Sequence, residues 1–204
     1  LVNLSTVLSL RNIEELTVKV YRTSLDGRSE LDAQNENDYK KIKAGLVPLT
    51  DKTQNKKYTV RPNYEEFNDT LNIGGFEPGV YMFEMTTMPE TELLRWIVKV
   101  SNLRVMAMEL PEKKIRYVVV DAHSGKPVNG AKIELRQHGK NELLATLSTD
   151  GNGEAVYNYD KKKPNRFYVY TDTDKALQEG RYYETFFANE TNRTTTKVKV
   201  LTDR

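Results

Sequence analysis

Cysteine is absent from the 204-residue chain, which excludes disulfide bonds and thiolate nucleophiles. Its absence also removes the thiolates that zinc sites most often use. Histidine is scarce, because His123 and His138 are the only two and both lie in or beside expected turns. Without a thiolate, a zinc site there would need carboxylates from elsewhere in the chain. We therefore expect surface histidines, no metal ligand, no cofactor-binding residue and no cofactor.

Long hydrophobic runs and blocks of one charge are also missing. No stretch approaches the roughly 18 apolar residues that a membrane-spanning helix needs, so we expect no membrane span. The chain carries 31 Lys plus Arg against 29 Asp plus Glu, a net charge of +2. This balance does not indicate a nucleic-acid partner. The first residues lack the basic start and apolar middle of a signal peptide, as a mature or excised fragment also would.

Hydrophobic residues nonetheless make up 38% of the chain, including 12 Tyr and 6 Phe, which is enough to bury a core. Leu16, Val18 and Val20 alternate with polar residues, which is the period of a strand with one buried face. Short runs of this kind, separated by turn residues, predict an all-β fold of two consecutive immunoglobulin-like β-sandwich domains. We place the first domain at residues 1–101 and the second at 102–204, because domains of about 100 residues are common.

The first half is predicted to contain one short helix among its strands. The helix covers residues 38–44, where Tyr39, Ile42 and Leu46 share one face and Gly45 is the expected stop. The other expected elements are a weak strand at 1–10, a strand around Val18, a loop at Pro48 and 51–57, short strands at 58–60 and 70–73, turns at Gly74-Gly75 and 77–79, a strand at 80–85, a hairpin connection at 88–92 and a strand at 94–100.

Turn sequences organise the second half. Asn129-Gly130 and Asp150-Gly151-Asn152-Gly153 follow apolar runs, and Asn and Gly tolerate the left-handed conformations that tight hairpins need. We expect strands at 103–108, 115–121, 131–137, 143–148, 154–159, 167–171, 182–187 and 194–201. Alternation directs Ile133 and Leu135 inward, and Lys132 and Glu134 outward. Replacing Gly130 or Gly151 with Val should destabilise this half.

Two acidic groups resemble cation sites, but a structural role explains each better. Asp150 to Glu154 carries oxygen ligands at alternate positions, yet Lys161 stands where a calcium loop of the EF-hand type needs a bidentate Glu. A hairpin turn is the better interpretation. The second group has its members at Asp172, Asp174, Glu179 and Glu184, and we interpret it as a solvated loop.

Other combinations of reactive or aromatic residues also favour structural roles. Asp121, His123 and Ser124 have the residue types of a hydrolytic triad, but they are too close in sequence to form one. The basic run 161–166 adjoins several aromatic residues, which suggests base stacking. The balanced net charge argues for a hairpin loop between strands instead. The sequons at Asn68, Asn189 and Asn192 are short enough to arise by chance.

The segment from Tyr182 to Phe187 places aromatic rings on both faces of an expected strand. One pair of rings can enter a core. The other pair, we infer, packs on a neighbouring domain, because a large exposed aromatic patch marks an interface.

The order Tyr117–Asp121, Gly125–Ala131, Ile133–Leu135 and Ala145–Gly153 resembles macroglobulin-like domains of the bacterial alpha-2-macroglobulin family. The Pro-Gly-Val-Tyr step at residues 78–81 and the terminal run 198–204 are similar to that family too. The resemblance is specific over about 94–204 and looser before that. It implies a pair of consecutive macroglobulin-like domains excised from the N-terminal part of a larger envelope protein.

What the resemblance implies is a non-catalytic scaffold, not an enzyme and with no catalytic residue. The whole protein would inhibit proteases, in many members through a bait segment and an internal thioester, which needs a Cys that this chain lacks. Implied partners are neighbouring macroglobulin-like domains of the same parent chain and, through the whole protein, a target protease. The implied location is the periplasm or cell surface.

A second interpretation is a carbohydrate-binding or adhesive β-sandwich of a surface protein, since the 125–153 pattern also resembles regulatory-like sandwich modules. A sugar site would need exposed planar aromatics on a concave face, with Trp96 and several Tyr as candidates. A scaffold domain would instead bury Trp96 in a core or an interface.

Overall fold

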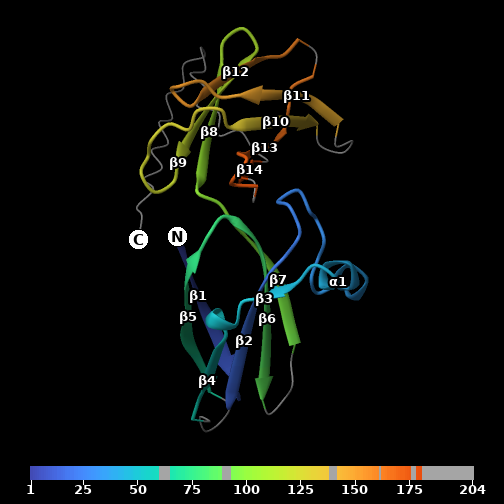
Figure 1. Cartoon of the computed structure of the whole chain (residues 1–204), viewed down its shortest axis with the longest axis vertical. Coiled ribbons are helices and arrows are strands. Elements are labelled where there is room, and N and C mark those ends of the chain that lie inside the picture. Colours follow the sequence, from blue (N-terminus) through green and yellow to red (C-terminus); the bar gives the residue numbers. More distant parts are fainter. Residues whose placement is uncertain (60–64, 89–92, 138–141, 161, 176–177, 181–204) are drawn as a thin grey trace.

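The computed structural model describes residues 1–59, 65–88, 93–137, 142–160, 162–175 and 178–180. Within these residues, nearly all of the regular structure is antiparallel β-strand, in four sheets, and the single α-helix lies beside the first group of strands. Figure 1 shows strands β1 to β7 at one end of the long axis and β8 to β14 at the other. We call these groups the first and the second sandwich. The predicted all-β class with one short helix is confirmed.

The first sandwich pairs a two-stranded sheet with a larger one. β1 (Val2–Arg11) and β5 (Glu66–Phe76) form the small sheet. The larger sheet contains β3 (Val47–Pro48), β2 (Glu15–Arg22), β6 (Gly79–Met88) and β7 (Leu93–Val100) in that order, with β4 (Gln54–Lys57) also paired to β2. Leu16, Val18 and Val20 are each only 1% exposed, so the predicted inward face of β2 is confirmed.

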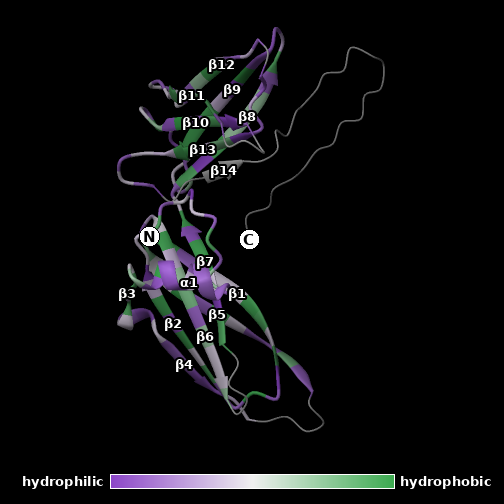
Figure 2. Cartoon of the chain, turned by 90° about the vertical axis from the view of Figure 1, so that its right-hand side faces the viewer, coloured by the Kyte–Doolittle hydropathy of each residue, from purple (hydrophilic) through white to green (hydrophobic). Residues whose placement is uncertain are grey.

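The predicted helix is α1 (Glu36–Lys43). It begins at Asn35, whose side-chain oxygen accepts hydrogen bonds from the backbone N–H groups of Asn37 and Asp38, as helix N-caps do. Ile42 is buried against Met82 of β6, and Tyr39 and Leu46 pack on the same cluster. Figure 2 shows the remaining face of α1 largely in the hydrophilic colour.

Three predictions for the first half were wrong. Pro48 and residues 51–57 are not all loop, because β3 contains Pro48, and a 3-10 helix (Thr50–Lys52) and β4 follow it. Pairing with β2 imposes both strands on this sequence. Tyr58 and Thr59 lie outside any strand, and position 60 is outside the described residues. Gly74 and Gly75 do not form a turn.

Instead, Gly74 and Gly75 lie inside β5, where the pairing with β1 shifts by one residue. Gly75 has a φ of 76°, and its N–H donates to the side-chain oxygen of Asn3. This β-bulge needs the left-handed conformation that glycine adopts readily. The glycine pair therefore bends a continuous strand and does not end one.

The second sandwich faces a three-stranded sheet against a four-stranded one. The three-stranded sheet has the order β12 (Glu154–Asn158), β9 (Lys114–Asp121) and β8 (Leu103–Leu110). The four-stranded sheet has the order β11 (Glu142–Ser148), β10 (Lys132–Gln137), β13 (Arg166–Tyr170) and β14 (Gln178–Gly180). Tyr117, Ile133 and Leu135 are fully buried between the sheets. The sequence did not predict β14, and the strands expected at 182–187 and 194–201 lie outside the described residues.

The turns of the second sandwich follow the predicted chemistry with one change. Asp150 Oδ1 accepts hydrogen bonds from the N–H groups of Asn152 and Glu154, so the hairpin-turn interpretation of this acidic group fits the geometry. Gly130 has a φ of 74°, as a tight turn requires. Gly151 does not have a positive φ and faces open space, whereas Gly153 has a φ of 73° and is buried. The critical glycine of this turn is therefore Gly153.

Candidate functional site: the joint between the two sandwiches

The first sandwich reaches the second through the segment from Thr23 to Gln34, between β2 and α1. We call this segment the clasp. Leu25 and Leu31 anchor it by packing against the cluster around Ile42. The side chain of Thr23 donates to the carbonyl of Val80 at 2.8 Å. The clasp is thus held on the first sandwich, while Arg28 and Glu30 contact the second.

Glu134 of β10 is the centre of the contact with the clasp. Its carboxylate is 3.2 Å from the guanidinium of Arg28 and 3.0 Å from that of Arg136. It also accepts a hydrogen bond from the Tyr170 hydroxyl at 3.2 Å. Burial, followed by the charge of Glu134, raises the pKa of Tyr170, while the guanidinium of Arg28 lies 5.4 Å from its ring centre. One carboxylate thus compensates two cations, one from each sandwich.

Glu134 was predicted to point outward, which would leave it in solvent, but its side chain is only 8% exposed. Alternation correctly puts it on the opposite face of β10 from Ile133, and Lys132 is exposed as predicted. The clasp contributes Arg28 to that face, so the side chain is covered and not solvated. A period-two pattern identifies the face of a strand but not what packs on it.

A second ion pair crosses the joint at Arg166 of β13. Its guanidinium lies 2.5 Å from the carboxylate of Glu30 in the clasp and 5.0 Å from the ring centre of Tyr168. Arg166 is buried and begins β13, so it lies beyond the hairpin loop that was predicted for the lysines at 161–163. Lys162 pairs instead with Glu142, which fits a loop role, and position 161 lies outside the described residues.

Asp174 joins the segment after β13 to the connection between the sandwiches. One carboxylate oxygen accepts hydrogen bonds from the Ser101 hydroxyl at 2.9 Å and from the Asn102 N–H at 2.7 Å. Asp174 is only 4% exposed, so the prediction of a solvated acidic loop was wrong here. Asp172 is exposed as predicted, and the side chains of Glu179 and Glu184 lie outside the described residues.

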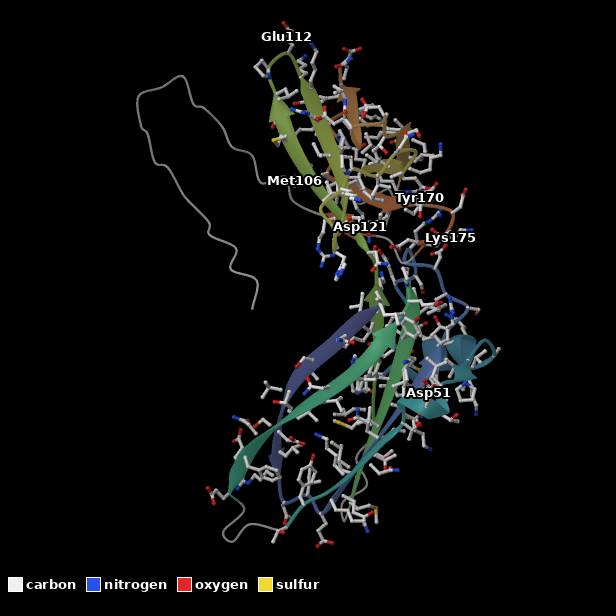
Figure 3. All side chains as sticks on the ribbon, turned by 60° about the vertical axis from the view of Figure 1, so that its left-hand side comes forward. Asp51, Met106, Glu112, Asp121, Tyr170 and Lys175 are labelled. Atoms are coloured by element: carbon white, nitrogen blue, oxygen red, sulfur yellow. The ribbon has the colours of Figure 1, made fainter. Side chains whose placement is uncertain are left out.

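Backbone contacts complete the joint. The N–H of Gly27 donates to the carbonyl of Lys175 at 3.1 Å across the joint. Within the first sandwich, the Lys99 ammonium of β7 donates to the carbonyl of Gly27 at 2.5 Å and so fixes the clasp there. Figure 3 shows Lys175 where the two sandwiches meet, with Tyr170 just inside the second. A groove of about 340 Å³ lies beside these contacts, and Arg22, Asp26, Pro78, Asp172 and Lys175 are among its lining residues.

Two ion pairs, Arg28–Glu134 and Arg166–Glu30, hold the joint together. Asp174 is held by the Ser101 hydroxyl and the Asn102 N–H, and its other carboxylate oxygen has no partner among the described residues. In the part of the chain that the structure describes, no three His, Asp or Glu residues gather closely enough to hold a metal ion. No described helix has the length and apolarity needed to cross a membrane.

The residues that resemble a hydrolytic triad form a turn. Asp121 Oδ1 accepts hydrogen bonds from the N–H of His123, the N–H of Ser124 and the Ser124 hydroxyl, at 3.1, 2.7 and 2.8 Å. These bonds, led by those from Ser124, lower the pKa of Asp121. The serine therefore donates to the carboxylate directly, as in a turn, with no histidine ring between them. His123 is exposed, and His138 lies outside the described residues.

Each sandwich contains a lysine, a carboxylate and a tyrosine in direct contact. In the first, Asp69 accepts from Lys56 and from the Tyr58 hydroxyl, both at 2.6 Å. In the second, Glu109 accepts from Lys163 at 2.6 Å and from the Tyr159 hydroxyl at 2.5 Å. The bond from Lys163, followed by that from Tyr159, lowers the pKa of Glu109.

The contact with Glu109 raises the pKa of Tyr159 to about 12. A raised pKa means that the folded state holds the proton more tightly than the unfolded state, whose tyrosines titrate near pH 10. We expect this stabilisation to be complete below about pH 10 and to be lost as the pH rises towards about 12. The Tyr159→Phe variant should lose less stability over that range, as measured by urea unfolding at each pH.

The Glu109→Gln variant is the matched control, because it removes the acceptor and keeps the tyrosine. Like Tyr159→Phe, it should reduce the loss of stability between about pH 10 and pH 12. It should also lose less stability in acid, where the lowered pKa of Glu109 makes the native chain lose stability as the pH falls below about 4.3. Parallel alkaline curves for all three proteins would contradict the assignment.

Trp96 does not lie on a polar concave face. Its ring stacks on Phe83, with ring centres 5.4 Å apart and an angle of 24° between the planes, and it packs against the core of the first sandwich. The groove beside it is lined mainly by apolar side chains. Sugar sites combine aromatic faces with convergent hydrogen-bonding groups. This arrangement gives the carbohydrate-binding interpretation no support.

Two antiparallel sandwiches, stacked end to end and held by one joint, define an immunoglobulin-like all-β protein. Two solved structures of native alpha-2-macroglobulin from Escherichia coli are similar to this chain in fold. The first spans domains MG0-NIE-MG1, with a TM-score of 0.60 and 15% identity over 85% of this chain and 57% of that chain. The second spans NIE-MG1, with a TM-score of 0.58 and 14% identity over 85% of this chain and 86% of that chain.

These similarities confirm the fold that the sequence resemblance implied. The chain spans somewhat over half of the three-domain structure and most of the two-domain structure. No protein-family model matches the chain, and no curated protein sequence matches it. At such low identity the likeness concerns the fold.

Proposed function

We propose that this chain is a non-catalytic scaffold unit of a bacterial alpha-2-macroglobulin-like protein, in which two domains are held at a fixed angle. The observation that carries the proposal is the joint, where the buried side chains of Asp174, Glu134 and Arg166 each make a polar contact with the first sandwich or with the connection to it. Buried charged groups of this kind must stay paired, because an unpaired partner is costly. The joint therefore resists bending.

We further propose domains at residues 1–101 and 102–204. Two separate hydrophobic clusters support this boundary, one built from residues between Leu16 and Val100 and the other from residues between Leu103 and Val169. The alignment with a two-domain structure spanning NIE-MG1 also supports it. On this basis the first domain corresponds to NIE and the second to MG1.

The role of the whole protein follows from the same proposal. A frame of such units would trap or inhibit proteases in the periplasm or at the cell surface. This chain would contribute rigidity and contacts with neighbouring macroglobulin-like domains, and it would meet the protease only through the whole protein. It would need no cofactor, metal or catalytic residue.

The Asp174→Ala variant tests whether the joint is rigid. Because the chain has no cysteine, single labels can be introduced as Asp51→Cys and Met106→Cys, at exposed positions in different sandwiches. Pulsed electron spin resonance should give a narrow distribution of distances between these labels in the parent chain. The Asp174→Ala change removes the acceptor of Ser101 and Asn102, so the distribution should broaden.

Asp172→Ala is the control, because Asp172 is the neighbouring exposed carboxylate. It should leave the distance distribution narrow. A broad distribution in the parent chain itself would overturn the rigid scaffold. Specific binding to a glycan array would favour the adhesive interpretation instead.

A further inference from the structure

The two sandwiches share a strand plan with one gap. Four antiparallel strand pairs of the first sandwich have a counterpart in the second. β1–β5 corresponds to β9–β12, and β2–β6 corresponds to β10–β13. Likewise β6–β7 corresponds to β13–β14, and β2–β4 corresponds to β10–β11. The remaining pair of the second sandwich is β8–β9. Among the described residues it has no counterpart, because β1 pairs with β5 alone.

An apolar groove of about 160 Å³ lies beside the strand that lacks this partner. Its lining comes from β1, β5, β6 and β7, namely Leu4, Ser5, Thr6, Leu71, Ile73, Phe83, Trp96 and Val98. Figure 1 shows β1 and β5 as a pair apart from β6 and β7. The groove thus opens between the two sheets of the first sandwich, with β1 on one side and β7 on the other.

In the second sandwich, β8 fills the equivalent place. It pairs with β9 along its whole length and contacts β13 and β14 of the facing sheet. Leu103 is buried, and Val105 and Ala107 pack against the core, whereas Met106 between them is 55% exposed. Figure 3 labels Met106 on the outer side of the strand. A strand with apolar side chains at alternate positions therefore closes the sandwich there.

The sequence of β1 differs from that of a strand with a permanently exposed edge. Edge strands in stable proteins usually carry lysine, proline or inward charges that prevent pairing. β4, at the other side of the first sandwich, reads Gln-Asn-Lys-Lys. β1 contains neither lysine nor proline, and its one charged residue is Arg11 at its end. Its composition suits a strand that is paired on both sides.

We propose that the groove is the docking site of one further β-strand, which pairs antiparallel with β1 and covers Trp96. The occupant is an extended segment of about eight residues with apolar side chains at alternate positions, joined to Leu1 by a tight turn as β8 is joined to β9. Its backbone would satisfy the unpaired edge of β1, and its apolar side chains would enter the groove. This inference does not depend on the proposed scaffold role.

The experiment extends the chain at Leu1 by an eight-residue strand that alternates valine with threonine or lysine, followed by an Asn-Gly turn. Trp96 is the single tryptophan and lines the groove, so its fluorescence reports occupancy directly. With the extension in register, the emission should shift to the blue and acrylamide quenching should fall by about half, because a partly exposed ring becomes covered. The thermal unfolding midpoint of the chain should also rise.

The control extension has the same residues displaced by one position, which turns its valines to the solvent face. It should leave quenching unchanged. As a test that does not depend on the fusion folding, the in-register strand added as a free peptide should reduce quenching in the unmodified chain.

Hydrogen exchange of the β1 amides supplies the decisive second measurement. The β1 amides that point away from β5 should exchange rapidly in the unmodified chain and slowly with the in-register extension, whereas the β1 amides bonded to β5 serve as the internal reference. Equal quenching with both extensions would overturn the proposal. Two other results would also overturn it, because each would show that something else occupies the groove. One is weak quenching of Trp96 in the unmodified monomer. The other is a dimer of the unmodified chain in which the edge amides of β1 are protected.

Discussion

Replacing Glu134 with glutamine is expected to lower the free energy of unfolding by about 2 kcal/mol, because two guanidinium groups lose their shared counter-charge. Arg28 and Arg136 would remain within 3.2 and 3.0 Å of a neutral group, and Arg136 is only 18% exposed. The contact between clasp and second sandwich should weaken with it. Urea unfolding monitored by circular dichroism measures the loss of stability.

Glu142→Gln is the matched control, because Glu142 also pairs with a cation but at the surface, where the two side chains are 41% and 52% exposed. Exposed ion pairs contribute about 0.5 kcal/mol or less, so this variant should unfold close to the parent midpoint. If both glutamine variants lost the same small amount, Glu134 would not be the centre of the joint.

The Gly153→Val substitution is expected to cost about 3 kcal/mol, because the left-handed backbone conformation and a steric clash act together. Gly153 has a φ of 73°, and a Cβ atom there would lie 2.4 Å from the carbonyl oxygen of Val119. That carbonyl belongs to β9 in the centre of its sheet, so it cannot move without breaking strand pairs. Thermal unfolding of the variant should show the loss as a lower midpoint.

Gly151→Val provides the comparison two residues away in the same turn. Gly151 has no positive φ, and nothing lies within 4 Å of the position that a Cβ would take. We expect its unfolding midpoint to stay close to that of the parent. Equal destabilisation by the two valine variants would contradict the geometry of the turn.

The sequence predicted most strands because burial on one face leaves a period-two pattern, as at Leu16, Val18 and Val20. It did not predict β4, where the residues are polar and backbone pairing with β2 imposes the extended conformation. It interpreted Gly74-Gly75 as a turn, because a glycine pair permits a turn and a bulge alike. The choice between them depends on β1, which is distant in sequence.

The joint was the part that sequence reasoning missed. Alternation placed Glu134 on the correct face of β10, but it could not reveal that a segment of the first sandwich covers that face. Asp174 was interpreted as solvated for the same reason. One local signal was available: Leu25 and Leu31 within the polar clasp indicate a segment that is anchored to the protein surface and not free in solvent.

The ion pair between Arg166 and Glu30 joins residues 136 positions apart in the chain. During synthesis from the N-terminus, the clasp is therefore complete long before its binding residues exist. The first sandwich can fold with the clasp already anchored, as N-terminal domains commonly do. The angle between the two sandwiches is then set only when the chain beyond β13 has emerged from the ribosome, so orientation is the last property of this unit to be acquired.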